Sequence, residues 1–142
     1  MVFRRQIKGM AALALIVSLL STGGTISAKE REFNIHRESC SVTTGNRVVT
    51  LNIEPKPVRP MQELTFTVTI APCEALPASL LLDLSMPGMQ MGNNQVTLLR
   101  KSGCVWEGKG IMVRCMSGRT LWQVTILSDE LKNPAFTFNV AK

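Results

Sequence analysis

The chain has 142 residues, of which 45% are hydrophobic, and its formal net charge at pH 7 is +6. Three of the sixteen basic residues lie among the first eight, so residues 29–142 hold thirteen Lys/Arg against ten Asp/Glu, and they contain no tyrosine. These cations are scattered singly, whereas a nucleic-acid surface needs clustered cations and usually aromatic stacking platforms. We therefore expect no nucleic-acid partner, and a chain of this length forms one domain with a modest core.

Residues 1–28 have the layout of a secretory signal peptide. Arg4, Arg5 and Lys8 precede an apolar run over residues 10–20, and small and polar residues follow as far as Ala28. This order is typical of a Sec signal, and the apolar run is shorter than the roughly 20 residues of a spanning helix. We predict cleavage after Ala28 and a periplasmic or other extracytoplasmic location. The alternative is an uncleaved N-terminal membrane anchor.

Alternation of apolar and polar residues begins after a polar N-terminal segment, residues 29–45, which we expect to be irregular. Turn residues such as proline, glycine and asparagine separate the apolar stretches that follow. The expected strands cover residues 49–53, 64–70, 79–85, 95–101, 103–107, 111–116, 120–127 and 135–140. The pattern predicts an all-β domain over residues 46–142, an antiparallel β-sandwich of seven or eight strands.

Four cysteines, Cys40, Cys73, Cys104 and Cys115, follow the leader. An even number in a small exported domain predicts two disulfides, for which three connectivities are possible. A hairpin turning at residues 108–110 would place Cys104 opposite Cys115, so we favour Cys104–Cys115 and, by elimination, Cys40–Cys73. A reduced cysteine pair that binds copper or zinc is the alternative.

Three of the six methionines that follow the leader, Met86, Met89 and Met91, fall within six residues around a Pro-Gly turn. Turns run over the surface and bury little, so packing alone explains such a cluster poorly. A thioether is a soft ligand that suits Cu(I). We predict that these three sulfurs hold one Cu(I) ion, with Met116 at another strand end as a further ligand. The alternative is apolar packing or an adaptable surface for a partner.

His36 is the only histidine, and its imidazole is a less favoured candidate ligand that could complete a copper site. No Cys-x-x-Cys pair, glycine-rich phosphate loop or Ser/His/Asp nucleophile setting is present in the sequence. We therefore expect a protein that is not an enzyme, and no small-molecule substrate is evident.

The segments Met86-Pro-Gly-Met-Gln-Met-Gly92 and Cys115-Met-Ser-Gly-Arg119, the second lying shortly before Trp122, resemble the YtkA-like/FixH-like family of bacterial extracytoplasmic domains. The resemblance covers about residues 46–141 and implies an immunoglobulin-type sandwich associated with copper handling, either in oxidase assembly or in metal efflux. The ligands that it implies are Met86, Met89, Met91 and Met116. The chain departs from the family at Cys115, where members tend to have proline, and at Thr120-Leu121, which separate Arg119 from Trp122. FixH-type members are membrane-anchored.

The sequence thus predicts an extracytoplasmic copper-binding accessory protein that holds or passes Cu(I) through methionine thioethers. Its predicted partner is a membrane transporter or an oxidase-assembly protein. The alternative function is a structural domain that binds no metal and uses the methionine-rich turn as a docking surface.

Overall fold

The computed structural model describes residues 31–142, and the predicted signal peptide and its cleavage site lie outside these residues. The described part is all-β: nine strands form one sheet, and residues 31–142 contain no helix. Within that range no helix is long and apolar enough to cross a membrane. The prediction of an all-β, sandwich-like fold is confirmed.

All neighbouring strands in the sheet are antiparallel except β1 and β9, which pair in parallel. Their order is β1-β9-β8-β5-β6-β7-β4-β3-β2. The strands are β1 (Glu32–Phe33), β2 (Cys40–Thr44), β3 (Arg47–Glu54), β4 (Glu63–Ala71), β5 (Ser79–Ser85), β6 (Gln95–Ser102), β7 (Val105–Ile111), β8 (Leu121–Leu127) and β9 (Ala135–Asn139).

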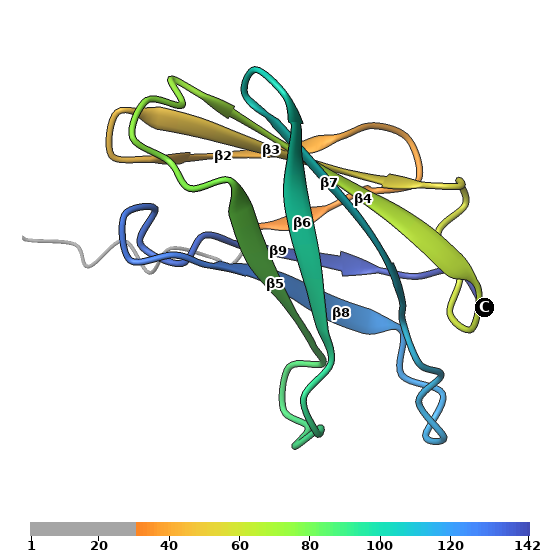
Figure 1. Ribbon diagram of the computed structural model, residues 1–142. Helices are drawn as coiled ribbons and strands as arrows, with labels where there is room; N and C mark the ends of the chain where they lie inside the picture. The colour runs from red at the N-terminus through yellow and green to blue at the C-terminus, as the bar shows by residue number, and fades with distance from the viewer. Residues whose placement is uncertain (1–30) are drawn as a thin grey trace, which may run out of the picture.

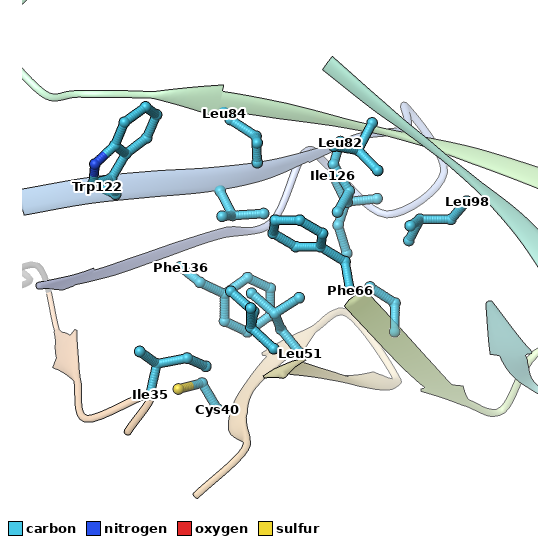
Figure 2. Packing of buried hydrophobic residues seen from close by; sticks show 14 of the residues in the cluster. Ile35, Cys40, Leu51, Phe66, Leu82, Leu84, Leu98, Trp122, Ile126 and Phe136 are labelled. Atoms are coloured by element: carbon cyan, nitrogen blue, oxygen red, sulfur yellow. The ribbon is translucent and has the colours of Figure 1, made fainter. Parts of the chain in front are cut away.

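The sheet folds over on itself, so that β2, β3 and β4 face β5, β8 and β9, and β6 and β7 join the two layers (Figure 1). The inner face is built by period-two alternation, which points every second side chain into the core. On β4, for example, Leu64, Phe66, Val68 and Ile70 are fully buried. Figure 2 shows Phe66 of β4 and Leu51 of β3 facing side chains of β8 and β9 across the core.

Strand β7 corrects the predicted hairpin at residues 108–110, because residues 105–111 form one continuous strand and the chain turns instead at Gly103. A Cβ atom on Gly108 would lie 2.3 Å from the Thr97 carbonyl oxygen, and one on Gly110 would lie 2.3 Å from Cγ2 of Val96. These glycines therefore let β6 approach the backbone of β7 closely, rather than forming a turn.

The N-terminal segment is also more regular than expected, since residues 29–45 include β1 and β2. Strand β2 pairs with β3, with Cys40 opposite Leu51, and β1 pairs with β9. Between them, His36 accepts a hydrogen bond from the Val58 amide at Nδ1 (3.0 Å) and donates one from Nε2 to the Asn139 carbonyl (2.8 Å). These contacts make the segment part of the domain.

Candidate metal site

The disulfide joins Cys73 to Cys104, whose Cα atoms are 5.5 Å apart, and both predicted pairings are wrong. Cys73 follows the end of β4, and Cys104 lies in the turn that leads into β7. Because β4 and β7 are neighbours, with the Ile70 amide bonded to the Cys104 carbonyl at 3.1 Å, these two cysteines meet. A disulfide is compatible with an extracytoplasmic, oxidising compartment.

Cys40 is a free thiol in the core, where only 2% of the residue is exposed. Figure 2 shows its sulfur beside Ile35, among apolar side chains. Burial in this setting raises the pKa of the Cys40 thiol to about 11, which outweighs the attraction of the nearby Lys56 charge. Cys40 is therefore a neutral core residue under physiological conditions.

Cys115, the second free thiol, lies where two loops meet at one end of the sandwich. The loop between β5 and β6 carries the methionine cluster, and the loop between β7 and β8 carries Cys115; both project in the same direction (Figure 1). The Cys115 Sγ atom lies 3.4 Å from the Met89 Sδ atom, in hydrogen-bonding contact. The loops also approach at Gly88, where an added Cβ would lie 3.7 Å from the Arg119 guanidinium.

Local turns hold both sulfurs in place. The Met89 amide bonds to the Met86 carbonyl at 3.0 Å, and the Gly118 amide bonds to the Cys115 carbonyl at the same distance. Each turn contains a glycine with positive φ, 79° at Gly88 and 77° at Gly118, a conformation that glycine adopts without steric cost. Sequence-local turns therefore present two sulfurs that are 26 residues apart in the chain.

The surroundings of Cys115 favour its thiolate. The Ser117 hydroxyl lies 2.9 Å from the Cys115 Sγ atom and can donate to it while the thiol proton points to Met89. Hydrogen bonds from the Ser117 hydroxyl and amide lower the pKa of the Cys115 thiol, and the amide and positive charge of Arg119 lower it further. A thiolate is the form of cysteine that binds metals.

The four predicted thioether ligands have different surroundings. Met86 is buried in the core, Met91 packs against the core, and Met89 is 36% exposed. Met116 is fully exposed, with its side chain in solvent. The structure thus brings Met89 to a second sulfur, and that sulfur belongs to Cys115 rather than to Met116.

Both nitrogens of the His36 ring already form hydrogen bonds. Nε2 bonds to the Asn139 carbonyl, and Nδ1 accepts from the Val58 amide. Neither nitrogen is left to bind a metal in this structure. The position of His36 indicates that it fastens the N-terminal segment to β9.

Sequence reasoning missed Cys115 because the predicted hairpin assigned it to a disulfide. The signals that were present are the hydroxyl of Ser117 two residues later and a departure from the resembling family at this position. Neither signal identifies a ligand without the contact to Met89.

A thiolate and a thioether form a soft donor pair, which suits Cu(I). Metal–thiolate bonds are about 2.3 Å long, so one ion can touch two sulfurs that lie 3.4 Å apart. Within residues 31–142, no three His, Cys, Asp or Glu side chains are grouped so that they could hold a metal ion. The sulfur pair is thus the arrangement in this part of the chain whose chemistry fits the expected metal.

Comparison of the chain with protein-family models, with curated proteins and with solved structures finds no match.

Proposed function

We propose that this protein is an extracytoplasmic copper-binding accessory protein, and that it holds and passes Cu(I) at the site formed by Cys115 and Met89. The observation that carries the proposal is the 3.4 Å contact between the Cys115 and Met89 sulfur atoms across two loops. The lowered pKa of Cys115 supports it, because the thiolate supplies the charge that a thioether lacks. Thioethers of Met86, Met91 and Met116 remain predicted further ligands.

The position of the sulfur pair suits a protein that transfers its metal. The pair lies on loops at one end of the domain, and Met89 is partly exposed, so an incoming donor can approach the ion. A membrane transporter or an oxidase-assembly protein, the partner classes implied by the family resemblance, would receive or supply copper at this end.

The test is an anaerobic titration in which the protein, with its disulfide intact, competes for Cu(I) with a chromophoric Cu(I) chelator. We expect Met89→Leu and Cys115→Ser each to weaken binding by more than about 100-fold, because loss of a ligand costs more than the 10- to 100-fold loss typical of an outer-shell residue. Leucine conserves the volume of methionine, so the fold should tolerate the first change. Met61→Leu, at an exposed side chain, is the matched control and should bind as the wild type does.

Stoichiometric Cu(I) binding that survives both substitutions would show that the site lies elsewhere. The docking alternative predicts a different result. The wild type would bind no copper, and Met89→Leu would still bind the partner because leucine keeps the apolar surface.

A further inference from the structure

A cavity of about 260 Å³ adjoins the sulfur pair, and Cys115 forms part of its wall. Its volume lies just below the 300–1,000 Å³ of typical small-molecule sites, which favours a ligand smaller than a drug molecule. The residues that matter for its chemistry are Cys115, the apolar Trp122, Val140 and Pro60, and the cationic Arg114 and Arg119.

The charged side chains of this cavity are mainly cationic: Arg114, Arg119 and Lys142 line it together with the Cys115 thiol. No Asp or Glu lines it, and among residues 31–142 neither the Arg114 nor the Arg119 guanidinium forms an ion pair or hydrogen bond with another side chain. An arginine pairs most strongly with a carboxylate or phosphate, through two parallel hydrogen bonds. Two guanidiniums that pair with no carboxylate side chain, beside an apolar wall, therefore match an organic anion with an apolar body.

We propose that this cavity binds a small organic anion that carries a soft sulfur donor, and that this anion exchanges Cu(I) with Cys115. This inference rests on the proposed copper function. The carboxylate of the ligand binds Arg119 and Arg114, its apolar part packs on Trp122, and its sulfur reaches the ion at Cys115. A copper–sulfur bond to the ligand forms as the bond to the Cys115 sulfur breaks. The copper stays Cu(I), and no electron is transferred.

The first experiment measures binding without metal. The probe is N-acetylmethionine, with N-acetylmethioninamide as its neutral counterpart; neither compound reduces the Cys73–Cys104 disulfide. We expect the anionic probe to shift the NMR signal of the Trp122 indole N–H. The neutral probe should bind at least about tenfold more weakly, because it cannot form the charge-assisted hydrogen bonds that a carboxylate forms with a guanidinium.

Matched variants identify the cations responsible. Arg119→Gln should weaken N-acetylmethionine binding about tenfold, whereas Arg37→Gln, which removes the same charge from an exposed turn outside the cavity, should leave it unchanged. Equal affinity for the two probes, or equal loss in the two variants, would overturn the inference.

The second experiment follows copper. The Cu(I)-loaded protein is mixed anaerobically with an excess of a strong chromophoric chelator, and each probe is added in turn at the same concentration. We expect N-acetylmethionine to accelerate transfer to the chelator about tenfold more than the neutral amide does, and Arg119→Gln to remove that difference. Identical acceleration by both probes would overturn the exchange role.

The two proposals can fail separately. If Cu(I) binds through Met89 and Cys115 but the cavity does not prefer the anion, only the present inference is wrong. If the wild type does not bind Cu(I), the proposed function is wrong and the exchange role falls with it, even where the anion binds.

Discussion

Ser117 favours the thiolate form of Cys115, because the hydrogen bond from its hydroxyl contributes most to the lowered pKa of that thiol. Replacement of Ser117 by alanine removes the donor and should raise the pKa of Cys115. The thiolate then forms at higher pH, so the pH profile of Cys115 alkylation by iodoacetamide should shift upward. Peptide mapping by mass spectrometry gives the rate for Cys115 alone.

Ser102→Ala serves as the control for this change, since Ser102 is exposed at the end of β6 and lies outside the site. An unchanged profile in Ser117→Ala would mean that other groups set the reactivity of Cys115. The buried Cys40, with its raised pKa, should stay unmodified in the folded protein.

At the scale of residues, part of the site was predictable. The clustering of Met89 with two other methionines in a turn identified it as a surface sulfur. The role of Cys115 was not predictable, since whether a cysteine forms a disulfide depends on which strands are neighbours. Likewise, the hydrogen bond between His36 and Asn139 was not predictable, because it joins segments that are 103 residues apart in the chain.

Among the elements, β7 carries the most specific steric requirement. A methyl group at Gly108 would lie 2.3 Å from the Thr97 carbonyl oxygen of β6, which is backbone and cannot turn aside. We expect Gly108→Ala to lower the free energy of unfolding by about 3 kcal/mol, the upper end of the usual cost of overpacking. Urea denaturation monitored by circular dichroism measures this change.

Gly92→Ala is the matched control, because no atom lies within 4 Å of an added Cβ there and its φ is not in the left-handed region. It should change the unfolding midpoint little. If Gly108→Ala changes the unfolding midpoint as little as Gly92→Ala does, then β6 and β7 are not in close contact at Gly108.

The strands with long alternation were predictable from sequence, since β4 and β8 bury every second residue. Strand β2 was missed because its five residues are mostly small and polar. This segment is a strand because it pairs with β3, which the local sequence does not show. Gly108 and Gly110 of β7 fitted the pattern of a turn, because a sequence shows the conformational freedom of glycine but not the close approach of β6.

For the molecule as a whole, the disulfide is the main covalent constraint in the described part. Cys73 and Cys104 are 31 residues apart in the chain, and closing a loop of this length stabilises a protein by about 3–4 kcal/mol in the chain-entropy account. We expect the Cys73→Ala/Cys104→Ala double variant to lose about that much free energy of unfolding. Thermal and urea denaturation of the oxidised proteins measure it.

Cys115→Ser provides the control, because the free Cys115 should contribute little to stability. Alkylation of the unfolded, unreduced protein should count two free thiols, at Cys40 and Cys115. A count of zero would mean that all four cysteines form disulfides, as we first predicted, and it would remove Cys115 from the proposed metal site.

The order of strands in the sheet has a consequence for how the chain folds. Strands β4 and β7, β5 and β8, and β1 and β9 are neighbours in space but distant in sequence, and such non-local pairing slows folding. During that time all four thiols are accessible in the oxidising compartment that we expect, and they compete for one native bridge. Cys115 stays a free thiol if Cys73 and Cys104 form their disulfide first. If the proposed copper site is correct, the speed with which β4 pairs with β7 determines how much of the newly made protein keeps Cys115 free to bind metal.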